Sequence, residues 1–229
     1  MPRGICYRCG APGTSREHFP PKAFFPRASG LQLRTVRSCE AHNTAKSGDD
    51  QYLLAHICIA AARRGNLAAD VFFRSIVPQL EASAGFAQSL QPDPAGGPNA
   101  VPVDSDRFDG FFDALACAVY FDRFGEVFDP STHRLRHVYP GLVHDTPDET
   151  AGAARMRDSF ASFFGRYEAM AERFEADKID EVVYANTIMA PAGTRASITI
   201  AHVFYGVFEV ISLMTYSPFQ LMMQAAEAE

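Results

Sequence analysis

The amino-acid sequence predicts an α+β fold, in which a short N-terminal unit of two strands and a helix precedes a larger region of helices and a small antiparallel sheet. Two Cys/His motifs flank an alternating segment within the first 50 residues. Aromatic side chains recur at helical spacing in the middle of the chain, and stretches rich in β-branched and aromatic residues follow near its end. We therefore place an N-terminal module at residues 1–65 and a second region at residues 66–229.

The first element is a pair of short motifs that we call knuckles, Cys6-x2-Cys9 and Cys39-x2-His42, separated by 29 residues. Sulfur and nitrogen ligands with this spacing match the tetrahedral coordination of structural zinc. A unit of about 50 residues with few large aliphatic side chains buries too little apolar surface to fold firmly. The apparent binding free energy of a structural zinc, roughly 10–16 kcal/mol, stabilises such a fold instead. We therefore predict one structural Zn²⁺ held by these four residues. The alternative is three unlinked thiols and an unrelated histidine, and His42 is the ligand that a neighbouring side chain would most readily replace.

The segment between the knuckles predicts a β-hairpin. Glu17 and His18 lie on the first strand, a turn is expected at residues 27–30, and residues 31–38 alternate as a second strand. Residues 39–47 then predict a short helix.

This order of elements resembles the HNH branch of the ββα-metal nucleases: an acidic–His pair followed by proline, a hairpin, and a helix with the pattern C-x2-[C/H]-N-x2-K-S, over roughly residues 5–52. The resemblance implies that His18 is the general base that deprotonates the attacking water. It also implies that Asn43 and Glu17, where the family usually has Asp, bind a catalytic Mg²⁺ or Mn²⁺ through oxygen atoms. In the same way, it implies phosphate contacts from Arg16, Lys22 and Lys46.

One feature of that family is missing from the sequence. The middle asparagine of the HNH motif orients the catalytic histidine and would fall near the end of the second strand, where this chain has no Asn. Gln32, Thr35 or a backbone carbonyl is the candidate replacement. If none of them orients His18, the module binds without cutting.

Net charge separates the N-terminal segment from the rest of the chain. Residues 1–47 contain eight Lys or Arg and two acidic side chains, a balance of +6, whereas the other 182 residues contain thirteen basic and twenty-five acidic ones, a balance of −12. A basic segment in an acidic protein is expected at a polyanion-binding site. We predict that nucleic acid, DNA in particular, binds the N-terminal module, and that the acidic C-terminal region is a candidate surface for a protein partner.

The rest of the chain predicts helices and then strands. We expect helices at 47–65, 67–89, 104–124 and 151–176, a linker at 91–102, strands at about 181–190, 197–205 and 207–216, and a short helix after Phe219. Core positions are expected for Cys58, Cys117, His56 and His202, and a Pro-rich loop is expected to hold His133, His137 and His144.

Several classes of protein are excluded, because the chain has no P-loop, no dinucleotide fingerprint and no Ser-centred nucleophile elbow. Its most apolar segment, 198–216, is interrupted by His202 and Glu209 and therefore predicts strands and no membrane helix. The N-terminus lacks the apolar stretch of a signal peptide, so we expect a cytoplasmic protein. The predicted function is a metal-dependent HNH-type endonuclease, a hydrolase acting on DNA phosphodiester bonds. The alternatives are a non-catalytic zinc module that binds nucleic acid or a partner protein, and an RNA nuclease.

Overall fold

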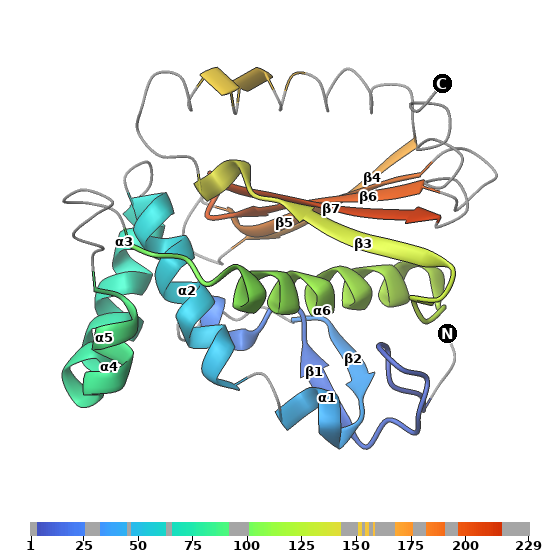
Figure 1. Cartoon of the computed structure of the whole chain (residues 1–229), viewed down its shortest axis with the longest axis horizontal. Coiled ribbons are helices and arrows are strands. Elements are labelled where there is room, and N and C mark those ends of the chain that lie inside the picture. Colours follow the sequence, from blue (N-terminus) through green and yellow to red (C-terminus); the bar gives the residue numbers. More distant parts are fainter. Residues whose placement is uncertain are drawn as a thin grey trace, which may run out of the picture.

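The computed structural model describes residues 4–25, 33–44, 47–62, 66–91, 101–142, 151–152, 154–155, 158, 168–175, 182–190 and 197–216. Within them the chain has the predicted α+β fold, with helices and two antiparallel sheets. Figure 1 shows a five-stranded sheet, the long helix α6 (Ser105–Phe124) along one of its faces, and the N-terminal unit on the opposite side of that helix. Helices α2 to α5 stand at one end of these layers.

The N-terminal unit has the predicted strand–strand–helix order. β1 (Ser15–His18) pairs antiparallel with β2 (Thr35–Ser38), and the short helix α1 (Glu40–Thr44) follows. A single 3-10 turn, η1 (Lys22–Phe24), lies in the connection between the strands. The second strand begins later than predicted, and the turn expected at 27–30 lies outside the described residues.

The helical region is less regular than the sequence predicts. Pro78 has no N–H and its ring crowds the preceding turn, which accounts for a π-helical turn before it. Ser83 then leaves the helical conformation, and its side chain accepts a hydrogen bond from the Phe86 N–H. These two interruptions divide the helix expected at 67–89 into α3 (Asn66–Val71), the π-helical turn (Phe72–Ile76), α4 (Val77–Ala82) and α5 (Ala84–Ser89). The preceding helix, α2 (Ser47–Ala62), is close to the prediction.

None of the helices in the described part of the chain is long and apolar enough to cross a membrane.

Both ends of α6 are capped. The Asp104 carboxylate accepts hydrogen bonds from the N–H groups of Asp106 and Arg107 at the first turn. Gly125 ends the helix with a φ of 70°, in the left-handed region that favours glycine. Most apolar side chains of α6, Cys117 included, are buried, as expected for a helix between two layers.

The five-stranded sheet has the order β3-β7-β6-β5-β4, and every neighbouring pair is antiparallel. The three strands predicted near the end of the chain are confirmed. The bounds are β3 (His133–Val138), β4 (Glu168–Glu175), β5 (Val182–Ala190), β6 (Ser197–Phe204) and β7 (Phe208–Tyr216), and η3 (Pro140–Leu142) follows β3.

Two predictions are wrong in this region. The described residues between 151 and 158 are helical, in agreement with the helix expected at 151–176. Its last part is instead a strand over 168–175, because pairing with β5 outweighs the helical propensity of its Ala, Glu and Met residues. His133 and His137 lie on the edge strand β3, which pairs with β7, and not in a loop. His144 and the tail after Phe219 lie outside the described residues.

The two predicted regions share one hydrophobic core. The buried Phe24 ring lies 5.6 Å from the ring of Phe111 on α6 and 5.2 Å from that of Phe204 on β6. The Tyr205 hydroxyl donates a hydrogen bond of 2.9 Å to the Phe24 carbonyl. The boundary predicted near residue 65 falls between α2 and α3 and stays a prediction, but the N-terminal unit packs into the same interior as the sheet.

A row of buried polar side chains connects the sheet to α6. His202 is fully buried, with Nδ1 at 2.8 Å from the Tyr184 hydroxyl and Nε2 at 3.1 Å from the Ser212 hydroxyl. The same serine oxygen lies 2.9 Å from His137 Nδ1, and His137 Nε2 lies 3.0 Å from an Asp113 carboxylate oxygen. His202 is therefore a hydrogen-bonded core histidine, as predicted. Because Ser212 is fully buried between two imidazoles, this Asp–His–Ser arrangement gives no access to a substrate.

This network makes folding sensitive to acid. Burial, with a smaller contribution from His137, lowers the pKa of His202 from 6.5 to about 3. Below pH 6.5 His202 binds a proton in the unfolded chain but not in the folded chain. The contribution of the neutral His202 to the free energy of unfolding is therefore complete above pH 6.5 and is lost as the pH falls towards 3. From this group we expect the free energy of unfolding at pH 5 to be about 2 kcal/mol lower than at pH 7. Urea titrations at the two pH values measure the difference, and an imidazolium signal from His202 in the folded protein at pH 5 would contradict it.

Candidate metal centre

Three cysteines and one histidine converge in the N-terminal unit. The ligand atoms of Cys6, Cys9, Cys39 and His42 all lie within 4.8 Å of one another. Cys9 Sγ is 3.8 Å from Cys39 Sγ, and His42 Nδ1 is 3.5 Å from Cys6 Sγ and 3.2 Å from Cys39 Sγ. In a tetrahedral site with Zn–S bonds of about 2.3 Å, two sulfur atoms are about 3.8 Å apart. The donor set and its spacing therefore fit a metal ion such as zinc.

The first knuckle is a tight turn that begins at Cys6. The Gly10 N–H donates to the Cys6 carbonyl over 2.9 Å, and the Cys6 N–H donates to the Ala11 carbonyl over 2.7 Å. Gly10 has a φ of 73°, which residues with a Cβ rarely adopt. Gly13 brings this turn against β2, since a Cβ at Gly13 would lie 2.8 Å from the Cβ of Arg37. Glycine is therefore required at two positions for the knuckle to form beside the hairpin.

The same turn favours the ionised form of one thiol. Burial raises the pKa of Cys6, but the backbone N–H groups of Arg8, Cys39 and Cys9, together with the His42 ring, outweigh burial and lower it to about 6. Metal ions bind the thiolate. The peptide geometry thus prepares Cys6 as a ligand.

The second knuckle joins the end of β2 to α1. The Cys39 carbonyl accepts hydrogen bonds from the N–H groups of His42, at 3.2 Å, and Asn43, at 3.0 Å. This first helical turn brings the His42 ring back beside the Cys39 sulfur. A metal ion here would link α1 to the first knuckle.

Glu17 and His18 occupy opposite faces of β1, because side chains alternate along a strand. His18 is exposed and Glu17 is half-buried. The buried Tyr7 hydroxyl donates a hydrogen bond of 3.2 Å to the Glu17 carboxylate. Burial, with the charge of Glu17, raises the pKa of Tyr7 well above its usual range, so this phenol remains a donor. A carboxylate offers about four acceptor positions, so the bond orients Glu17 without using them all.

The other predicted site residues are distributed around this hairpin. Asn43 is exposed on α1, which packs beside β1, and within the described residues no hydrogen bond joins it to Glu17 or His18. Thr35 lies directly opposite His18 in the strand register. Arg16 and Lys22 are exposed, whereas Gln32 and Lys46 lie outside the described residues.

Sequence reasoning missed two residues next to this site. Tyr7 contacts Glu17 from within the first knuckle, and its position between two cysteines was its one signal. Arg37 lies directly opposite Arg16. That pairing depends on the strand register, and the sequence does not give the register because residues 19–34 separate the two strands.

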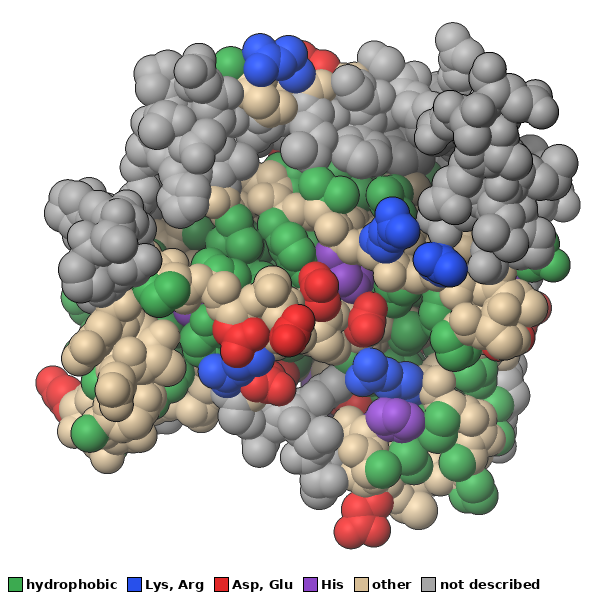
Figure 2. All heavy atoms as spheres, in the orientation of Figure 1, with side chains coloured by type: hydrophobic (Ala, Val, Ile, Leu, Met, Phe, Trp, Pro, Cys, Tyr) green, Lys and Arg blue, Asp and Glu red, His purple; other side chains and the backbone are tan. Residues whose placement is uncertain are grey.

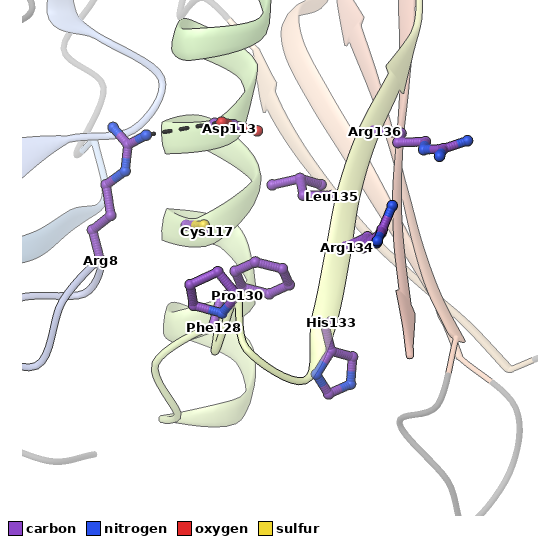
Figure 3. A pocket seen from close by; sticks show the side chains of 9 residues that line it. All are labelled: Arg8, Asp113, Cys117, Phe128, Pro130, His133, Arg134, Leu135 and Arg136. Atoms are coloured by element: carbon purple, nitrogen blue, oxygen red, sulfur yellow. Dashed lines mark ion pairs between the residues drawn. The ribbon is translucent and has the colours of Figure 1, made fainter. Parts of the chain in front are cut away.

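A cavity of about 500 Å³ lies between the first knuckle, α6 and β3 (Figure 3). Arg8 faces Asp113 across this space, with guanidinium and carboxylate 3.9 Å apart. Arg134 and Arg136 project from β3 away from Arg8. Of the described residues that line the cavity, none is a predicted catalytic residue, so it is separate from the predicted site.

The surface around α6 is acidic. Figure 2 shows acidic side chains gathered over the middle of this face of the molecule, where α6 runs in Figure 1. Asp106 and Asp109 of α6 are exposed. A polyanion would be repelled here, which leaves the basic hairpin as the more favourable surface.

Comparison of the chain with family models, with curated proteins and with solved structures finds no match.

Proposed function

We propose that this protein is a metal-dependent nuclease of the HNH type, which hydrolyses phosphodiester bonds of nucleic acid, DNA in particular. One observation carries the proposal: next to the Cys3His cluster, α1, which bears Asn43, packs beside β1, which bears Glu17 and His18, in a strand–strand–helix order. His18 and Asn43 are both exposed, as the reaction of a long polymer requires.

In the proposed reaction the His18 imidazole accepts a proton from water, and the water oxygen forms a bond to phosphorus. The bond from phosphorus to the leaving sugar oxygen breaks, and that oxygen takes a proton from solvent. Glu17 and Asn43 would hold a divalent ion through oxygen atoms. A bound Mg²⁺ or Mn²⁺ supplies charge stabilisation at the scissile phosphate. Zinc in the cluster would be structural, since four protein ligands complete its coordination.

Plasmid cleavage tests the proposal. Zinc-loaded protein should convert supercoiled DNA to nicked and linear forms when Mg²⁺ or Mn²⁺ is added, and a parallel RNA substrate decides between the two nucleic acids. A His18→Ala preparation controls for contaminating nucleases. Intact plasmid and intact RNA with both ions would refute the proposal.

We predict that Thr35 replaces the missing middle asparagine. It lies directly opposite His18, and cross-strand neighbours are close enough for a hydroxyl to orient the imidazole. Thr35→Val keeps the shape and the strand propensity but removes the hydroxyl, so kcat should fall about 10–100-fold at an unchanged melting temperature. Thr35→Ser is the matched control and should remain active. A Thr35→Val protein with the wild-type rate contradicts this role.

A non-catalytic module that binds nucleic acid is the second candidate function, and Glu17 is the observation that favours it. Glu17 projects to the face of β1 opposite His18 and accepts a hydrogen bond from Tyr7. A carboxylate used only in this way would leave the site without its metal ligand. Salt-dependent DNA binding without cleavage is the result that would support this alternative.

A further inference from the structure

Two arginines face each other on one side of the hairpin. We call this side, which is formed by Arg16, His18, Thr35 and Arg37, the outer face. Arg16 is paired with Arg37 in the register. The Arg37 carbonyl accepts a hydrogen bond of 2.9 Å from the Tyr7 N–H, so its backbone polar groups point away from β1. Arg16 and Arg37 therefore form the pair type without mutual hydrogen bonds, in which Cα atoms are about 4.5 Å apart and side chains are closest.

Among the residues that the structure describes, no carboxylate pairs with these two charges. Both side chains are exposed, and neither forms an ion pair within the described residues. Arg34, by contrast, lies 2.6 Å from Asp122. Like charges directly opposite each other destabilise a strand pair. The hairpin therefore carries a repulsion that an external anion would relieve.

The position of the pair is fixed by the backbone. Tyr7 and Gly13 both hold Arg37 against the first knuckle, through the hydrogen bond to its carbonyl and through the close approach to its Cβ. The spacing between the two guanidinium stems is thus set before any ligand arrives, which lowers the cost of binding.

We infer that Arg16 and Arg37 form a phosphate clamp that holds the nucleic-acid backbone on the outer face of the hairpin. The inference rests on the proposed function, since it names the groups that position the polymer at that site. Guanidinium groups bind phosphate oxygens through paired hydrogen bonds. His18 lies two residues from Arg16 on the same face of β1, so a clamped backbone passes beside the proposed base.

The composition of this face favours nucleic acid over other polyanionic partners. It contains no Phe, Tyr or Trp ring and no aliphatic side chain, whereas protein interfaces use such side chains as anchors and membrane-surface segments insert them. The surrounding residues 1–47 carry a balance of +6. A chain of phosphates matches a polar, basic and exposed strand face.

Binding of a fluorescent duplex of about 20 base pairs tests the clamp. Anisotropy is measured over a salt series with zinc-loaded full-length protein and no added Mg²⁺ or Mn²⁺, so that cleavage does not interfere. Arg37→Gln and Arg16→Gln should each weaken binding about tenfold and reduce the log–log salt slope by about 0.9. The matched control is Arg136→Gln, an exposed arginine on β3 opposite Leu213, which should bind like the wild type.

Thermal stability gives a second, independent readout. Arg37→Gln removes the repulsion, so at low salt its melting temperature should rise by about 1–3 °C, and the difference should disappear at high salt. A purely structural arginine would give a lower melting temperature instead.

The outcomes separate the clamp from the nuclease proposal. Wild-type affinity and slope in Arg37→Gln overturn the clamp, even if plasmid is cleaved. If Arg37→Gln and Arg136→Gln lose DNA affinity equally, binding is not localised on the hairpin, and the clamp is overturned as well. If only Arg16→Gln and Arg37→Gln lose DNA affinity and the wild type does not cleave plasmid, the clamp is supported and only the nuclease proposal is refuted.

Discussion

Cys6→Ser should lose its bound zinc and melt at least about 10 °C below the wild type. The N-terminal unit has two strands of four residues and a helix of five, too little regular structure to hold both knuckles in place by itself. With Cys6 replaced, three donors remain of the four that the cluster offers, and an incomplete site binds zinc weakly. Metal analysis of protein purified without added zinc should find about one equivalent in the wild type.

Cys58→Ala is the matched control for this experiment. Cys58 is buried in α2, outside the cluster, and burial raises its pKa to about 12, so it remains a thiol. The control should keep its zinc. If Cys6→Ser retains both the metal and the wild-type melting temperature, the four residues are not a metal site.

His18→Ala should lower the cleavage rate about 10²–10⁴-fold, because it removes the proposed general base for the attacking water. His18 is exposed on β1, so its removal should disturb little packing. Zinc content and melting temperature should therefore match the wild type. The decisive comparison is activity against melting temperature in the same preparations.

Asn43→Ala tests the other half of the proposed site. It should also abolish cleavage at low Mg²⁺ and be partly rescued by high Mn²⁺, which binds N/O ligands differently. Glu17→Gln should resemble it, since a metal ligand loses its charge, and Tyr7→Phe shows how much of the effect comes from the hydrogen bond alone. If His18→Ala cleaves at the wild-type rate, the site lies elsewhere. If His18→Ala and Asn43→Ala both unfold, these residues are scaffold and the binding module takes precedence.

The features that the sequence predicts well are local ones. The spacing of the two knuckles identifies the four side chains that the fold brings together. Asp104 and Gly125 mark the two ends of α6 because capping depends on a few adjacent backbone groups. His202 is recognised as a core residue because it alternates with apolar neighbours on a strand.

The features that escape prediction depend on pairing between distant segments. Residues 168–175 have helical composition and form a strand because β5 lies beside them. Arg37 becomes a neighbour of Arg16 only through the register of β1 and β2. Tyr7 reaches Glu17 only after the first knuckle has folded against β2. None of these contacts follows from periodicity or from spacing along the chain.

The packing of Phe24 means that the N-terminal unit is not a transferable cassette. Its ring lies against α6 and β6, and its carbonyl accepts a hydrogen bond from a tyrosine 181 positions further along the chain. An excised fragment ending near residue 65 would leave this ring in water and the Tyr205 hydroxyl without its acceptor. We therefore expect the chain to melt in one cooperative transition, and loss of metal at the cluster to loosen the distant sheet as well.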